Sequence, residues 1–191
     1  MKKLIAILSF CIISTFSLMA QSSIGSVYGV TLGDTQRSVI YALDSQGKSG
    51  SLETFEDGTR CYEISSPTLG SCTFQYACFY FKNAKLNKVV FYSNDGGAMD
   101  TNFQGAFNAY DNFISNGDRF QRIFRTMKFD LTDKYGIPQL EDDEKAIWKS
   151  GDNQIILEYS FKDEPMGYGW RNGSTIVSVS YCKSAQSSVN Y

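Results

Sequence analysis

Carboxylates, cysteines and clustered aromatic rings are the side chains of this 191-residue chain that could carry chemistry. The chain contains no histidine, so it lacks the usual general base, the commonest metal ligand and the usual partner of a nucleophilic serine or cysteine. The acidic run at residues 141–144 lacks the alternating ligand spacing and the turn glycine of a calcium loop. We therefore expect a protein that is not an enzyme and that needs no cofactor and no metal ion.

Four carboxylates in the first half of the chain leave one enzymatic alternative open. Glycoside hydrolysis uses two carboxylates that flank the scissile bond, so a hydrolase acting on polysaccharide or peptidoglycan is the alternative function. The spacing of the four residues does not select a pair, and acids without a catalytic role have the same pattern. They are Glu53, Glu56, Asp57 and Glu63.

Residues 1–20 have the pattern of a cleaved secretory signal peptide. Lys2 and Lys3 precede an apolar stretch, and Leu18-Met19-Ala20 offers a small-residue cleavage site. We expect a mature chain that begins near Gln21, carries no lipid, spans no membrane and is periplasmic or extracellular. Removing the signal leaves 16 basic and 20 acidic residues, a net charge of about −4, and this balance does not favour nucleic acid as a partner.

Four cysteines follow the signal, namely Cys61, Cys72, Cys78 and Cys182. An even number of cysteines in an exported chain is typical of disulfides. Cys72 and Cys78 fall six residues apart in or beside one predicted strand, about 20 Å at strand rise, whereas a bridge needs Cα atoms within about 7 Å. We expect a disulfide between Cys61 and Cys72. Pairing of Cys61 with Cys78 on neighbouring strands, and a free buried Cys78 thiol, stay open.

Residues 73–93 are predicted to form the central hairpin of the sheet. Two runs rich in aromatic and β-branched residues, 73–81 and 86–92, flank a polar tetrad. Because side chains alternate across a strand, Ala77, Phe79 and Phe81 share one face and Tyr76, Cys78 and Tyr80 share the other. Both faces are apolar, so the tyrosine face is either covered by protein or contacts a partner.

Aromatic residues of two predicted hairpins are the candidate binding residues. We expect the turn of the second hairpin at Asn172-Gly173, because both residues tolerate positive φ. Rings that stay exposed beside such turns are typical of protein interfaces, whereas a second helical layer that covers Tyr76 and Tyr80 is the alternative. The candidates are Tyr76, Tyr80, Tyr92, Tyr168 and Trp170.

Helical periodicity occurs twice, each time before strand-like segments. Residues 36–43 carry apolar side chains at helical spacing after Asp34 or Thr35, either of which can cap the helix. A second helical region is interrupted at residues 116–118 and ends near Gly136. We predict an α+β protein, with helices packed on one face of an antiparallel sheet. Two αβββ units, residues 21–96 and 97–191, would form one compact domain.

The chain resembles small bacterial envelope domains of the type of β-lactamase inhibitory protein and the small outer-membrane-assembly lipoproteins. The resemblance lies in residues 30–35, followed by Val39 and Leu43, in the helix end at residues 135–138, and in the hairpin at residues 79–91. Two departures are the absence of a lipid-accepting cysteine and the presence of Ala84 where the turn often has glycine. The resemblance implies a sheet-based module that binds or inhibits a protein of the envelope or medium, and a structural envelope protein is a further alternative.

Overall fold

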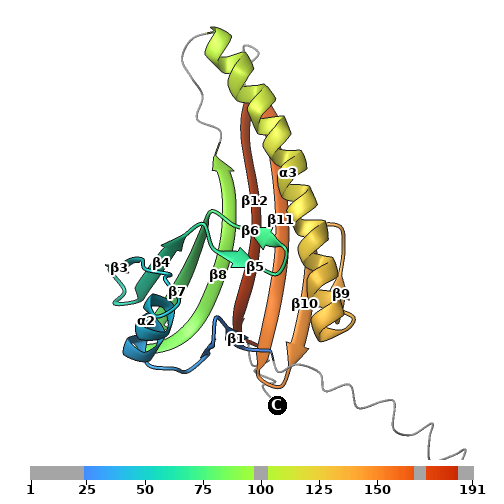
Figure 1. Ribbon diagram of the computed structural model, residues 1–191. Coiled ribbons are helices and arrows are strands. Elements are labelled where there is room, and N and C mark those ends of the chain that lie inside the picture. Colours follow the sequence, from blue (N-terminus) through green and yellow to red (C-terminus); the bar gives the residue numbers. More distant parts are fainter. Residues whose placement is uncertain (1–23, 97–102, 166–170, 185–191) are drawn as a thin grey trace, which may run out of the picture.

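The computed structural model describes residues 24–96, 103–165 and 171–184 (Figure 1). Its centre is an eight-stranded antiparallel sheet in the spatial order β3-β4-β7-β8-β12-β11-β10-β9. The strands are β3 (Ser51–Thr54), β4 (Arg60–Ser65), β7 (Tyr76–Lys82), β8 (Lys85–Gly96), β9 (Leu140–Glu141), β10 (Lys145–Ser150), β11 (Asn153–Pro165) and β12 (Arg171–Lys183). The fold is thus mixed and rich in antiparallel sheet, as predicted.

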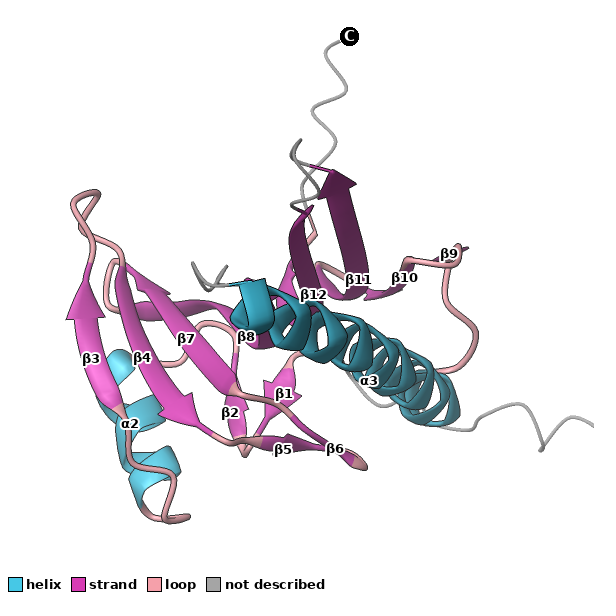
Figure 2. Ribbon diagram, turned by 90° about the horizontal axis from the view of Figure 1, so that it is seen from above, coloured by secondary structure: helices cyan, strands magenta, loops and turns pink. Residues whose placement is uncertain are grey.

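Two helices and two small hairpins lie on the same side of this sheet (Figure 2). They are α2 (Gln36–Asp44), α3 (Phe103–Tyr135), β1 (Ser26–Val27) with β2 (Val30–Thr31), and β5 (Thr68–Leu69) with β6 (Cys72–Thr73). We call this side the inner face of the sheet and the opposite side the outer face. Within the described ranges, no helix is both long and apolar enough to cross a bilayer.

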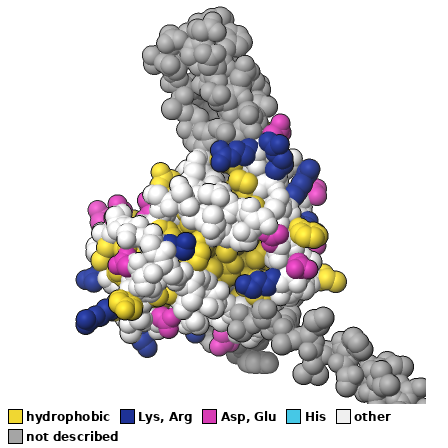
Figure 3. Space-filling model, in the orientation of Figure 1, with side chains coloured by type: hydrophobic (Ala, Val, Ile, Leu, Met, Phe, Trp, Pro, Cys, Tyr) yellow, Lys and Arg dark blue, Asp and Glu magenta, His cyan; other side chains and the backbone are white. Residues whose placement is uncertain are grey.

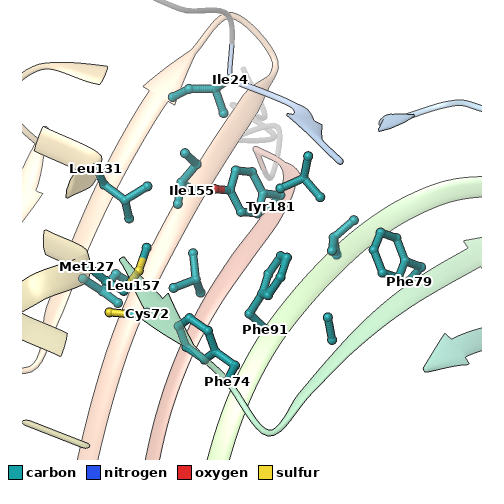
Figure 4. Close-up of a cluster of buried hydrophobic side chains, with 14 of the residues drawn as sticks. Ile24, Cys72, Phe74, Phe79, Phe91, Met127, Leu131, Ile155, Leu157 and Tyr181 are labelled. Atoms are coloured by element: carbon teal, nitrogen blue, oxygen red, sulfur yellow. The ribbon is translucent and has the colours of Figure 1, made fainter. Parts of the chain in front are cut away.

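The core lies between the inner face and α3. Buried residues recur at spacings of three and four along α3, at Phe120, Phe124, Met127, Leu131 and Tyr135, which places them on one side of the helix. Figure 4 shows Met127 and Leu131 close to β11, whose Ile155 and Leu157 are also buried. The predicted inner-face set of Ala77, Phe79 and Phe81 is buried. Strand alternation therefore predicted this face correctly.

Helix α2 begins where the β7–β8 hairpin turns. The Thr35 hydroxyl accepts a hydrogen bond from the Ser38 amide at 3.3 Å, which confirms Thr35 as the N-cap. The Gln36 amide donates to the Ala84 carbonyl at 2.9 Å, and the Leu86 amide donates to the Asp34 carbonyl at 2.8 Å. These bonds join the start of α2 to the central hairpin.

The turn of that hairpin holds Ala84 in an unfavourable conformation. Asn83 and Ala84 have φ of 53° and 55°, the left-handed region that costs an alanine about 1 to 2 kcal/mol. We expect Ala84→Gly to raise the free energy of unfolding by about 0.5 to 1 kcal/mol, because glycine removes this strain but makes the unfolded chain more flexible. Chemical denaturation followed by circular dichroism measures the change.

A matched control lies beside it in the same turn. Asn83→Gly is expected to change stability less, because asparagine already tolerates left-handed backbone. If Ala84→Gly lowers stability while Asn83→Gly raises it, the turn geometry described here is wrong.

The predicted break in the long helix at residues 116–118 is wrong, because α3 continues through it. A Cβ atom on Gly117 would lie 2.6 Å from Cε2 of Phe161. A larger residue at position 117 would therefore displace the Phe161 ring, and the Tyr159 hydroxyl reaches the Gly117 carbonyl at 3.4 Å. Tertiary packing has overridden the weak local helix propensity. The predicted helix end is confirmed, since α3 ends at Tyr135 and Gly136 has a φ of 82°.

The predicted turn at Asn172-Gly173 is also wrong. Both residues belong to β12, where Asn172 pairs with Glu164 and Gly173 pairs with Asp163. Strands β11 and β12 pair up to Pro165 and Arg171, so their connection lies within residues 166–170, outside the described part of the chain. Asn-Gly can form a turn, but the continuous pairing of β11 with β12 places this dipeptide inside a strand.

Candidate binding site on the outer face of the sheet

The outer face of β7 and β8 carries three partly exposed tyrosines. Tyr76 pairs directly with Tyr92 across the two strands, and their ring centroids are 5.5 Å apart. Tyr80 lies on the same face and pairs with Lys88. Tyr76 is 36% exposed, and in Figure 2 the described helices and hairpins all lie on the inner side. The structure thus places Tyr76, Tyr80 and Tyr92 together on one face, and we call these three residues the tyrosine surface.

Phe55 extends this surface toward the edge of the sheet. Its ring stacks on Tyr80, with centroids 6.4 Å apart and planes inclined by 23°. The turn after β3 holds Phe55 in place, because its amide donates to the Thr59 carbonyl at 2.8 Å. The Asp57 carboxylate accepts from the Thr59 amide at 2.9 Å. Phe55 was not among the predicted binding residues, because its only local signal is a single aromatic residue in a polar passage.

Glu63 joins the tyrosine surface to a cysteine. It lies on β4 directly opposite Cys78 of β7. One oxygen of its carboxylate, Oε2, accepts a hydrogen bond from the Tyr92 hydroxyl at 3.1 Å and another from the Cys78 thiol at 3.3 Å. The carboxylate therefore fixes the orientation of the Tyr92 ring, and strands β4, β7 and β8 each contribute one member of this group.

The structure does not contain the predicted disulfide between Cys61 and Cys72, and both are free thiols. Cys61 lies on the outer face, opposite Tyr80. Cys72 lies in β6 on the inner side, where its sulfur is 3.9 Å from the Ile123 carbonyl of α3. The predicted strand at residues 73–81 begins only at Tyr76, because the chain first forms the β5–β6 hairpin against α3. The sheet thus separates the two cysteines that we expected to pair.

The two outer-face cysteines, Cys61 and Cys78, have pKa values shifted in opposite directions. The hydrogen bond with Cys78, together with burial and the charge of Glu63, raises the pKa of Cys61. The hydrogen bond from Cys61 lowers the pKa of Cys78, although burial and Glu63 oppose this. Burial, together with the neighbouring Cys78 and Glu63, raises the pKa of both Tyr80 and Tyr92. The tyrosines are therefore neutral hydrogen-bonding groups at neutral pH.

The four predicted carboxylates lie in β3, in β4 and in the turn between these strands, next to this group. Tyr168 and Trp170 lie outside the described residues. Of the carboxylates, Glu53 lies on β3 opposite Cys61, and Glu56 lies in the following turn. Asp57 is bonded to Thr59, and Glu63 is bonded as described above. Among the residues that the structure describes, no cluster of three or more cysteines and acids could hold a metal ion.

An open hollow of about 670 Å³ lies at the other end of the outer face, around the β9–β10 connection. Two of the four acidic residues that line it, Asp142 and Glu158, have partners for their carboxylates. The Lys145 ammonium is 2.6 Å from a carboxylate oxygen of Glu158, and Asp142 accepts from the amides of Glu144 and Lys145 at 2.8 and 2.6 Å. These contacts stabilise the β9–β10 connection.

The surface on the inner side carries side chains of both charges. Figure 3, in the orientation of Figure 1, shows acidic and basic side chains interspersed across that view, with hydrophobic side chains visible between the charged groups.

Comparisons of the chain with protein families, with curated proteins and with solved structures find no match. The interpretation of the site therefore rests on its own residues and contacts.

Proposed function

We propose that this protein is an exported, non-catalytic binding module that engages a protein partner of the cell envelope or the medium through the outer face of its sheet. The observation that carries the proposal is the position of the tyrosine surface. An antiparallel sheet with one solvated face usually carries polar side chains there. Here three tyrosines occupy that face at its centre, and both helices lie on the other side.

The tyrosine surface suits a protein partner for two physical reasons. Tyrosine offers a large apolar ring with a polar tip and is enriched at interface hot spots. Tyr92 is held by Glu63 at 3.1 Å and by contact with the Tyr76 ring. Binding then costs less side-chain entropy, because these rings are ordered before the partner arrives.

The topology supports a two-unit organisation, residues 21–96 and 97–191. In each unit a described helix, α2 or α3, precedes the strands of the eight-stranded sheet, and the last strands of the two units, β8 and β12, pair at its centre. This arrangement agrees with the resemblance to small bacterial envelope domains. Export follows from the signal pattern of residues 1–20, and the partner is accordingly a protein of the envelope or medium.

The test compares matched tyrosine variants against one partner. The mature chain first captures its partner from the envelope and medium of the source cells, and calorimetry then measures the affinity of each variant. We expect Tyr76→Ala and Tyr92→Ala each to weaken binding by about 2 kcal/mol or more, roughly 30-fold. The reason is that each variant removes a preordered ring from the centre of the surface.

The control is Tyr41→Ala. Tyr41 is 77% exposed on α2, on the opposite side of the sheet, so its removal should leave the affinity unchanged. Loss of affinity in Tyr41→Ala, with normal binding by both outer-face variants, would place the interface on the helical side and defeat the proposal.

A further inference from the structure

Cys61 and Cys78 are diagonal neighbours on adjacent antiparallel strands. The register pairs Cys61 with Tyr80 and Glu63 with Cys78, so both cysteines point to the outer face. Each is only 3% exposed, and each shifts the pKa of the other. The register and the burial thus place the two thiols as buried diagonal neighbours on the outer face.

We propose that Cys61 and Cys78 are a redox-active pair that forms a cross-strand disulfide on reaction with a small-molecule disulfide. This inference does not depend on the tyrosine surface binding a partner. The even number of mature cysteines still allows one internal bridge, and the structure favours this pair over Cys61 with Cys72.

The backbone geometry is close to what a bridge requires. Diagonal residues on paired strands have Cα atoms about 7 to 8 Å apart, and a disulfide needs about 7 Å or less. Closure thus requires side-chain rotation and an approach of the strands by about 1 Å. Beyond β4 lies only the edge strand β3, whose four residues are all exposed. Tyr62 and Ile64 hold the inner side of β4 in the core, at 5% and 2% exposure. The oxidant therefore reaches the buried sulfurs during local opening of the β3–β4 edge.

The chemistry is ordinary thiol–disulfide exchange. The thiolate of Cys78 attacks one sulfur of the small disulfide, whose S–S bond breaks to give a mixed disulfide and a first thiolate. Cys61 transfers its proton to this thiolate and attacks the Cys78 sulfur, which expels the second thiolate; that thiolate takes a proton from water. Two protein thiols are oxidised to one disulfide, and the small disulfide is reduced to two thiols. The pKa of Cys78 is lowered and that of Cys61 is raised, which supports Cys78 as the attacking group.

Oxidation changes the contacts of Glu63. In the reduced protein the Cys78 thiol donates to Glu63 Oε2 at 3.3 Å. The disulfide has no S–H group, so Glu63 keeps only the Tyr92 hydroxyl of these two donors. The redox state of the pair is therefore coupled to the group that orients Tyr92.

The other cysteines are unsuitable partners. Cys72 lies on the inner side against α3. Cys182 lies on the outer face of β12, where it pairs with Lys88 of β8, so β8 and β7 separate it from Cys61. Neighbouring strands lie about 4.8 Å apart. The three strand spacings between Cys61 and Cys182 therefore exceed the reach of a disulfide.

The test is disulfide mapping of the folded mature protein, residues 21–191, after treatment with oxidised glutathione. Free thiols are blocked with N-ethylmaleimide before digestion. Trypsin leaves three cysteines in one peptide, residues 61–82, so the digestion uses a glutamate-specific protease and chymotrypsin, which cut after Glu63 and after Phe74 or Tyr76. We expect a peptide that links Cys61 to Cys78, with loss of two of the four alkylatable thiols and their full return after reduction.

Two variants sharpen the result. Cys61→Ser should form no bridge and should accumulate a mixed disulfide with glutathione at Cys78, whereas Cys182→Ser should form the bridge as the unaltered protein does. Absence of any bridge in oxidised glutathione, or a main product that links either cysteine to Cys72 or Cys182, would overturn the proposal. The map of the unaltered protein decides the matter even if Cys61→Ser fails to fold.

Discussion

Replacing Trp148 with alanine is expected to lower the free energy of unfolding by about 3 to 5 kcal/mol. The indole lies on β10 and is 1% exposed. Its Nε1 donates a hydrogen bond of 2.8 Å to the Gly136 carbonyl, just beyond the end of α3. The substitution leaves a cavity and an acceptor without its partner, so the end of α3 should detach from the sheet first. Urea denaturation followed by circular dichroism measures the loss.

Trp148→Phe separates the two contributions. Phenylalanine fills much of the site but cannot donate to Gly136, and we expect a smaller loss, about 1 to 3 kcal/mol. A cost below about 1 kcal/mol for Trp148→Ala would show that α3 does not end against β10 as described.

Phe91→Ala is expected to have an effect of similar size, about 3 to 5 kcal/mol. Phe91 is fully buried at the centre of an aromatic cluster. Its ring centroid lies 5.8 Å from those of Tyr28 and Phe74 and 6.4 Å from that of Tyr181, and Figure 4 shows three of these residues together. These rings come from the β1–β2 hairpin, the segment before β7, and β12, so the truncation loosens three segments at once.

Phe129→Ala is the matched control for Phe91→Ala. Phe129 is an exposed ring on α3, and its removal should change the free energy of unfolding by no more than about 0.5 kcal/mol. Equal losses from the two variants, measured by the same denaturation, would contradict the placement of the core on the inner face.

Local patterns predicted the central hairpin and the first helix well. Alternation along residues 76–81 separates Phe79 and Phe81 from Tyr76 and Tyr80 without any knowledge of neighbouring strands, because the period of a strand is two. The cap at Thr35 is equally local, since it needs only the amides of the next turn.

Features that depend on distant contacts were not predictable in the same way. Helix α3 continues through Gly117 where it packs against Phe161 of β11, 44 positions later. The position of Asn172 within β12 depends on its register with β11. In both cases a local break signal is weaker than the packing and pairing of whole elements.

The candidate site also combines residues that local patterns predict with residues that only distant contacts bring together. Tyr76, Tyr80 and Tyr92 were found from their alternation, whereas Phe55 and Glu63 reach the site only through the pairing of β3, β4 and β7. The pairing of the cysteines failed for a related reason. Loop closure between Cys61 and Cys72 is possible in sequence, but the sheet places the two residues on opposite faces.

The most direct test of the proposed binding face is photo-cross-linking in the source cells. A photoreactive phenylalanine analogue replaces Tyr76 in one version of the exported protein and the exposed Tyr41 of α2 in another. We expect position 76 to form a covalent adduct with one partner protein and position 41 to form none. An adduct from position 41, with none from position 76, would contradict the assignment of the outer face as the binding surface.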